Sequence, residues 1–278
     1  MIIIKPNAKI ISPDITSPGV VINMYKQIET AGRTCYKSKN KKVAELETQI
    51  SELEKIKEPT AEQILEMVEL LNKLEEAKVE SAKAFVRGLV KNGHEAMIEH
   101  VSVTVRFTVD RGVSHELVRH RLASWAQEST RYCNYGNEKF GNEITFIEPV
   151  FYESIPKARR EMIQNAVENN FKNTPSSFEK MSNLEKRYVD WCYACYISEQ
   201  SYLEMIKLNA TPEEARDVLT TSVKTEVVMT MNMREIRHFF KLRAIGTTGK
   251  PHPQMVEVAM PLLKQCREAM PELFDDII

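Results

Sequence analysis

Residues 101–110 (VSVTVRFTVD) alternate between apolar and polar side chains along their whole length. Valine or phenylalanine stands at every odd position, and the even positions carry serine, threonine, arginine or aspartate. Because successive side chains of a strand point to opposite faces, this pattern predicts a β-strand with one buried face. Residues 143–149 predict a second, shorter strand. With the helices expected elsewhere, the predicted fold class is α+β, a central and mostly antiparallel sheet flanked by helices.

Lysine, glutamate, leucine and alanine dominate the segment from residue 39 to about residue 80. Its apolar residues recur every three to four positions, which indicates a helix. Pro59 interrupts the pattern, and Thr60 with Gln63 forms a capping box for a second helix. We therefore expect a charged helical hairpin over about residues 39–92, inserted into a single domain of residues 1–278. We favour a solvated antiparallel arm, and a partner-binding coiled coil is the alternative.

Capping and glycine signals predict four further helix boundaries. They are a helix over residues 18–31 that Gly32 ends, a helix capped by Ser114 that carries residues 117–120, a helix opened by residues 211–214 (TPEE), and a helix capped by Asn232 with Glu235 that ends near Gly246.

The composition limits the partners and the location of the chain. A formal net charge of −1 gives no general field for a nucleic-acid backbone, so we expect no nucleic-acid partner. The opening run MIIIKPNAKII is too short to span a bilayer and lacks the features of an export signal. The five cysteines are odd in number and scattered, which does not suggest a disulfide framework. These features predict a cytoplasmic protein with no membrane partner.

The run RHRLASWAQESTRY, residues 119–132, places three arginines, one histidine and two serines in fourteen positions. Guanidinium groups pair bidentately with phosphate or carboxylate, and hydroxyl groups fill the remaining acceptor sites, so the run indicates an anion site. Arg119, His120 and Arg121 are consecutive, and on a helix they would fan out by about 100° each. They must therefore serve more than one ligand, or lie where the helix ends.

This run resembles the signature of the flavin-dependent thymidylate synthases, in which RHR is followed by seven residues and a serine. Here the pattern is Arg119-His120-Arg121, LASWAQE and Ser129, with Arg131 two residues later. Three more parts of the chain are similar to that family: residues 93–100 (GHEAMIEH), Arg216, and residues 232–243 (NMREIRHFFKLR). The resemblance thus covers most of the chain outside the hairpin.

The resemblance implies the reductive methylation of dUMP to dTMP. Methylenetetrahydrofolate would donate the one-carbon unit, NADPH would be the reductant, and bound FAD would carry the reducing equivalents. Members of the family need no cysteine nucleophile, so Cys133 is not assigned that role. They are homotetramers whose active sites combine several subunits, and we expect the same of this chain.

Site residues follow from the resemblance, position by position. It assigns dUMP binding to Glu116, Gln127, Ser129, Arg131, Arg216 and Arg243, and FAD binding to Cys35, His94, Arg119, His120, Arg121, Gln127, Asn232, Arg234 and His238. Arg243 is the predicted catalytic residue, because a fixed guanidinium would stabilise negative charge on the uracil ring. Arg234 and Arg243 lie nine residues apart, about half a helical turn out of phase, so we expect them to address different places. The spacing of His94 and His100 differs from the HExxH arrangement, and no metal site is expected.

Five positions depart from the usual pattern of the family. They are Gln127 for glutamate, Ala96 for threonine, Cys35 for serine, Thr220 for proline and His238 for asparagine. Gln127 keeps a hydrogen-bonding carbonyl group but loses a charge, which weakens any role as a base.

Two other functions stay open at this stage. A noncatalytic module could bind nucleotides or RNA through the basic run, with Trp125, Tyr132 and Tyr135 stacking on bases. Alternatively, the hairpin could be the functional part, as a docking arm for a partner.

Overall fold

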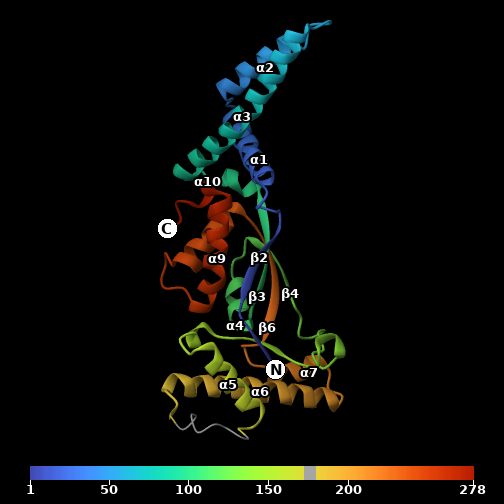
Figure 1. The fold of residues 1–278 in the computed structure, drawn as a ribbon, viewed down its shortest axis with the longest axis vertical. Helices are drawn as coiled ribbons and strands as arrows, with labels where there is room; N and C mark the ends of the chain where they lie inside the picture. Colours follow the sequence, from blue (N-terminus) through green and yellow to red (C-terminus); the bar gives the residue numbers. More distant parts are fainter. Residues whose placement is uncertain (172–179) are drawn as a thin grey trace.

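The computed structural model describes residues 1–171 and 180–278 of an elongated molecule (Figure 1). One end is formed by α2 (Lys41–Leu53) and α3 (Ala61–Lys91), which lie against each other and project from the body. The middle holds a sheet with the C-terminal helices beside it. The other end is formed by α5 (Lys157–Glu168) and α6 (Asn183–Lys207).

Four strands form a fully antiparallel sheet in the order β2-β3-β6-β4. Their bounds are β2 (Asn7–Ser12), β3 (Ser102–Asp110), β6 (Lys224–Asn232) and β4 (Ala123–Gln127). The antiparallel sheet confirms the coarse fold prediction, but β2 and β4 were not predicted. A separate parallel pair joins β1 (Ile2–Ile4) to β5 (Thr145–Ile147).

One face of the sheet makes the main core of the molecule. Val103, Val105, Phe107 and Val109 on β3 are at most 1% exposed, so the predicted alternation is confirmed. The helices α8 (Met233–Phe240) and α9 (Pro253–Ala269) pack with this face in one apolar cluster. Phe239 of α8, for example, meets Phe107 with ring centroids 6.1 Å apart. The sheet therefore presents its polar face away from these helices, and its buried face positions α8.

The helix α1 (Pro18–Tyr36) runs past Gly32, so the prediction that Gly32 ends it was wrong. Gly32 is buried, and a Cβ added there would lie 2.3 Å from the ring of Phe85 on α3. The glycine is therefore needed for the close approach of two helices, not for a helix end. The helix ends at Lys37, whose backbone is left-handed at φ 49°.

The predicted cap at Ser114 was also wrong. Asp110, the last residue of β3, caps α4 (Arg111–Leu117), and its Oδ1 accepts a hydrogen bond from the Val113 backbone N–H at 2.9 Å. Strand and helix follow each other without a loop, so the strand's final residue becomes the cap. Ser114 lies inside the helix, fully buried. Because α4 ends at Leu117, the three consecutive basic residues of the signature lie beyond the end of the helix.

The predicted cap at Thr60 is confirmed in full, and the cap at Asn232 is confirmed without the Glu235 side chain. Thr60 and Gln63 form a capping box at the start of α3, and Asn232 accepts a hydrogen bond from the Glu235 backbone N–H at the start of α8. After α8 the chain continues as a π-helix (Lys241–Ile245) to Gly246, as expected. The helices α2 and α3 occupy the predicted hairpin, and its status as an insertion stays a proposal. Among the described residues no helix combines the length and the apolar character needed to cross a membrane.

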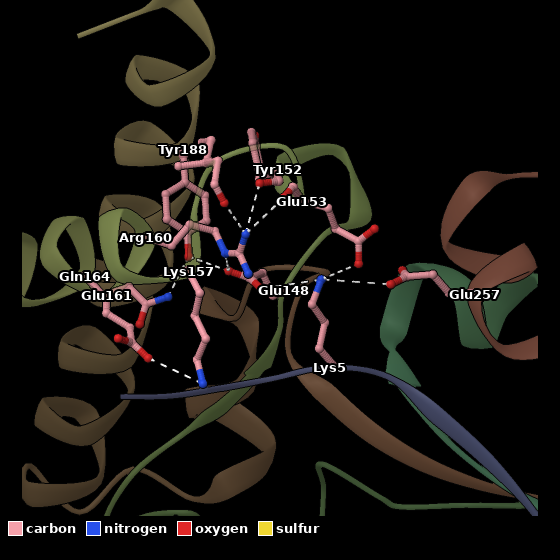
Figure 2. Close-up of polar contacts among 11 residues, drawn as sticks. Lys5, Glu148, Tyr152, Glu153, Lys157, Arg160, Glu161, Gln164, Tyr188 and Glu257 are labelled. Atoms are coloured by element: carbon pink, nitrogen blue, oxygen red, sulfur yellow. Dashed lines mark hydrogen bonds and ion pairs between the residues drawn. The ribbon is translucent and has the colours of Figure 1, made fainter. Parts of the chain in front are cut away.

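A buried polar cluster attaches the α5–α6 end of the molecule to the rest (Figure 2). Glu148 follows β5, and its side chain is 8% exposed. It accepts hydrogen bonds from Arg160 Nε of α5 at 2.8 Å and from the Tyr188 hydroxyl of α6 at 2.6 Å. On the other side, Lys5 Nζ lies 3.4 Å from Glu148 and 2.9 Å from Glu153. Burial of the carboxylate is thus offset by two cations and a hydroxyl donor.

Glu257 of α9 is the strained member of this cluster. Lys5 Nζ is 4.0 Å away, and within the described residues the buried Oε2 atom has no hydrogen-bond partner. Burial raises the pKa of Glu257 to about 7; Lys5 opposes this increase, and the charges of Glu153 and Glu148 add to it. The ionised carboxylate therefore costs the folded state free energy at neutral pH.

We predict that Glu257→Gln stabilises the protein at high pH. A raised folded-state pKa means that stability falls as pH rises from about 4.5 towards 7 and then levels off. At about pH 8 the variant should be more stable than wild type by roughly 1–2 kcal/mol, and near pH 4.5 the two should match. Denaturant unfolding at both pH values measures this. Glu161→Gln, an exposed residue near Lys157, is the control; equal effects of the two substitutions would contradict the prediction.

Candidate active site

Arg243 is the centre of a hydrogen-bond network that joins three parts of the chain. Its Nε donates to His120 Nε2 at 3.1 Å, and its NH1 donates to Glu116 Oε2 at 2.9 Å. Glu116 belongs to α4, His120 follows α4, and Arg243 lies in the π-helix after α8. Two predicted dUMP residues and one predicted FAD residue are therefore in direct contact within one subunit.

The contact with Arg243 fixes the protonation state of His120. Because Nε2 accepts a hydrogen bond from a guanidinium, the single ring proton must be on Nδ1, which faces Glu235 Oε1 at 3.4 Å. His120 is 5% exposed, and burial lowers its pKa to about 4, with further lowering by Arg243 and His238. The imidazole is therefore neutral at physiological pH. Trp125 adds a hydrogen bond from its indole Nε1 to the His120 carbonyl oxygen at 3.1 Å.

Glu235 was not predicted as a site residue. The sequence indicates a capping residue, since Glu235 stands three positions after Asn232. Only half of that box forms: Asn232 Oδ1 accepts from the Glu235 backbone N–H, while the Glu235 carboxylate turns towards His120. Nothing in the local spacing distinguishes these two uses of a glutamate, because the partner is 115 residues away.

Gln127 lies at the end of β4 and is held from two sides. Its amide Nε2 donates to Ser114 Oγ of α4 at 3.0 Å and to Thr225 Oγ1 of β6 at 3.2 Å. Ser114 and Thr225 were likewise not predicted as site residues. A neutral amide fits this place as a donor, so the departure from glutamate changes the charge without leaving the side chain unsupported.

Three of the predicted dUMP ligands, Ser129, Arg131 and Arg216, lie around α7 (Pro212–Ala215) and are suited to bind the phosphate of dUMP. Arg131 Nε pairs with Glu213 of α7 at 3.2 Å, and its backbone N–H donates to Ser129 Oγ at 3.3 Å. Arg216 caps the C-terminus of α7. The turn after β4 and the start of this helix thus bring two arginines and a hydroxyl group to one part of the surface.

Four of the predicted flavin residues, Cys35, His94, Asn232 and Arg234, lie at the opposite end of the sheet. The Tyr36 hydroxyl hydrogen-bonds His94 Nδ1 at 2.8 Å, next to Cys35 at the end of α1. Arg234 NH1 pairs at 2.5 Å with Glu99, which belongs to the short 3-10 helix (Glu95–His100) before β3. The nine residues of β3 span about 27 Å between this end and α4. One subunit therefore does not bring these residues together with the phosphate ligands.

Arg234 and Arg243 do address different places, as their spacing predicted, because one pairs with Glu99 and the other with Glu116. Arg119 and Arg121 are exposed on either side of buried His120, and neither has an ion-pair partner within the described residues. The ring of His238 lies 6.1 Å from that of His120. Arg119 and Arg121 can therefore bind an anion next to the network of Arg243, His120 and Glu116.

Other aromatic, cysteine and metal-ligating side chains lie outside the Arg243 network. Of the three aromatic residues expected to stack on bases, Tyr135 is buried and its hydroxyl donates to Glu128 at 2.7 Å, Trp125 is partly buried, and Tyr132 is 78% exposed. Cys192 and Cys195 are buried, and burial raises the pKa of both thiols, that of Cys195 to about 12. In the part of the chain that the structure describes, no three metal-ligating side chains cluster.

The sequence matches the family model described as thymidylate synthase complementing protein over residues 21–272. A flavin-dependent thymidylate synthase of Nitratidesulfovibrio vulgaris is 29% identical over 202 residues, which cover 72% of this chain and 69% of the relative. That of Pyrococcus abyssi is 32% identical over 172 residues, covering 61% of this chain and 57% of the relative. The matched region is thus little more than half of some relatives' length.

Among solved structures, the chain is similar to a UMP/dUMP methylase, PolB, from Streptomyces cacaoi bound with 5-Br dUMP. The TM-score is 0.59 at 17% identity, and the alignment covers 99% of this chain and 96% of that one. At this identity the likeness shows a shared fold.

We predict that His120→Gln removes an acid-sensitive part of the stability. The folded-state pKa of His120 is depressed to about 4 from 6.5, so its neutral form favours folding above about pH 6.5, and this stability is lost as pH falls towards 4. Between about pH 7 and pH 5 wild type should lose roughly 1–2 kcal/mol more than the variant. Urea unfolding measures the difference. His115→Gln, an exposed histidine of α4, is the control, and an unchanged pH profile in His120→Gln would refute the assignment.

Proposed function

Because the chain belongs to the thymidylate synthase complementing protein family, we propose that it methylates dUMP reductively to dTMP. Methylenetetrahydrofolate donates the one-carbon unit and NADPH supplies the reducing equivalents through FAD. The single observation that carries the proposal is the network in which Glu116 and neutral His120 hold the guanidinium of Arg243. Such a fixed cation suits a pyrimidine that gains negative charge during reaction.

The residues present fit a flavin dinucleotide. Its pyrophosphate needs cations that are not already neutralised, and Arg119 and Arg121 are exposed without ion-pair partners in the described part of the chain. Arg234, His238, Asn232, His94 and Cys35 are the other proposed contacts. When bound, FAD passes reducing equivalents from NADPH to the one-carbon unit.

The proposed substrate site has two parts. Ser129, Arg131 and Arg216 bind the dianionic 5′-phosphate, to which the guanidinium groups and the hydroxyl donate hydrogen bonds. Arg243, supported by Glu116, contacts the pyrimidine, and Gln127 lies between these parts on β4. Binding the phosphate positions the ring against Arg243, so that binding energy far from the reacting atoms lowers the barrier.

The proton of His120 matters for the role of Arg243. A charged imidazole beside the guanidinium would repel it, whereas the neutral ring accepts its Nε–H without adding a second positive charge. The ion-pair partner of Arg243 is then Glu116 alone among the described residues. Glu235 keeps the ring proton on Nδ1. The protein thus offers a single oriented cation to the developing charge, without moving a proton to or from His120.

Complete sites in this proposal contain residues from more than one subunit of a homotetramer. The phosphate ligands and the His94 region lie at opposite ends of one sheet, about 27 Å apart along β3. A neighbouring copy can supply the second end. The proposed catalysis uses no cysteine nucleophile, and it assigns no role to half-buried Cys133 or to buried Cys192 and Cys195.

Two measurements test the proposed function. The purified protein should be yellow with a flavin absorption spectrum, and should release tritium from dUMP labelled at carbon 5 only when methylenetetrahydrofolate and NADPH are both present. A protein that takes up no FAD, or that releases no tritium with FAD bound, would contradict the proposal.

We predict that two arginine substitutions separate the two roles. Arg243→Ala should keep FAD binding but lower the turnover number by roughly a hundredfold or more, because a fixed charge is lost in the transition state. Arg119→Ala should chiefly weaken FAD binding, by roughly tenfold. Flavin fluorescence titration and steady-state kinetics distinguish the two. Arg187→Ala, on α6 away from the site, is the control; equal loss of FAD binding in both site variants would show that the division of roles is wrong.

A further inference from the structure

A groove of about 690 Å³ lies between α1 and the α2–α3 hairpin, outside the proposed active site, and follows α2 along its length. Its walls come from α1, α2, α3 and the segment that joins α1 to α2. The basic side chains that line it are Lys26, Arg33, Lys39, Lys55 and Lys78, and the acidic ones are Glu29, Glu47 and Glu52. Basic groups therefore outnumber acidic groups in a chain whose net charge is −1.

The floor of the groove is built from a hydrogen-bonded polar network. Ser81 of α3 is 6% exposed; its Oγ accepts from Arg33 NH2 at 3.0 Å and from Asn40 Nδ2 at 2.8 Å, and donates to Glu29 Oε1 at 2.5 Å. Arg33 Nε also donates to Glu29, at 2.7 Å. The one carboxylate of the floor is thus neutralised in place, and the network holds the three helices in a fixed relation.

Among the other charged residues of the lining, Lys26 pairs with Glu75 at 2.5 Å and Glu52 is exposed. Lys78 pairs with Glu47 at 3.1 Å. Lys39 and Lys55, by contrast, are exposed and have no ion-pair partner among residues 1–171 and 180–278. Lys39 precedes α2 and Lys55 follows it, so they lie near opposite ends of a helix whose thirteen residues span about 18 Å. The free positive charge is therefore spread along the groove, which fits an extended ligand with several separated anionic groups better than one compact phosphate.

The groove also neighbours the proposed flavin region. Thr30 of α1 lines both this groove and a second hollow of about 670 Å³, whose lining includes Cys35, Met97 and His100. The aromatic pair of Tyr36 and His94 lies at the end of the same helix. A ligand that reaches the redox region on one side of α1 could place a long tail on the other side.

We propose that this groove binds the multiply anionic tail of a co-substrate, with Lys39 and Lys55 as its free cations. The inference rests on the proposed function. Two co-substrates have suitable chemistry: the γ-linked oligoglutamate of a folate, with one carboxylate per residue, and NADPH, with its 2′-phosphate. The spread of the charges favours the oligoglutamate. The hairpin then acts as one wall of a binding groove.

Calorimetric binding to the FAD-loaded protein tests the proposal without depending on turnover. The probes are tetrahydrofolate with one glutamate and tetrahydrofolate with five. We expect the five-glutamate form to bind roughly tenfold more tightly to wild type, and the double variant Lys39→Ala/Lys55→Ala to lose most of this advantage. The variant Lys42→Ala/Lys73→Ala removes two exposed lysines outside the groove and should keep the advantage. Raising the salt concentration should reduce it in wild type.

A second arm compares NADPH with NADH, which lacks the 2′-phosphate. Suppose that Lys39→Ala/Lys55→Ala weakens the binding of NADPH but not of NADH, and leaves the binding of both folates unchanged. The groove then binds an anionic tail as proposed, and the nucleotide is its ligand. If wild type binds both folates with equal affinity, and the double variant changes the affinity for neither NADPH nor NADH, the proposal is overturned. If folate affinity depends on the number of glutamates but the protein shows no turnover, only the proposed function is contradicted. Failure of the groove proposal and failure of the proposed function are therefore distinguishable.

Discussion

The hydrogen bond from Arg243 to the neutral imidazole of His120 is the interaction on which the proposed site depends. It joins the segment after α4 to the π-helix after α8, two regions 123 residues apart in the chain. It forms because the sheet buries one face against α8, and because His120 is buried deeply enough to stay uncharged. Burial of an imidazole is usually only a cost; here it leaves an acceptor that can orient a cation without repelling it.

The sequence predicted the features that depend on local periodicity and capping. The alternation over β3 identified a half-buried strand, and the boxes at Thr60 and Thr211 identified two helix starts. The helical phase of Arg234 and Arg243 was enough to show that they face different partners. These properties are set by neighbours within a few residues, so a single sequence carries them.

Features set by contacts far apart in the chain were predicted poorly. Gly32 resembles a helix end in the sequence, but in the structure it allows the close approach of Phe85 from another helix. The strand β4 lies inside the basic signature, and its five residues are too few for a clear alternation. Glu235 has the spacing of a cap residue, although its carboxylate faces His120. The two-ended arrangement of the site residues was implied by the family resemblance rather than by any spacing. Which subunit completes which site remains part of the proposal.

The protonation state of His120 tests the central claim most directly. Nitrogen NMR of the selectively labelled histidine ring, followed from about pH 8 to about pH 5, should show a neutral imidazole throughout, with its proton on Nδ1 and Nε2 unprotonated. A ring that becomes charged near pH 6.5, or one that carries its proton on Nε2, would contradict the account, because neither form can accept the hydrogen bond from Arg243.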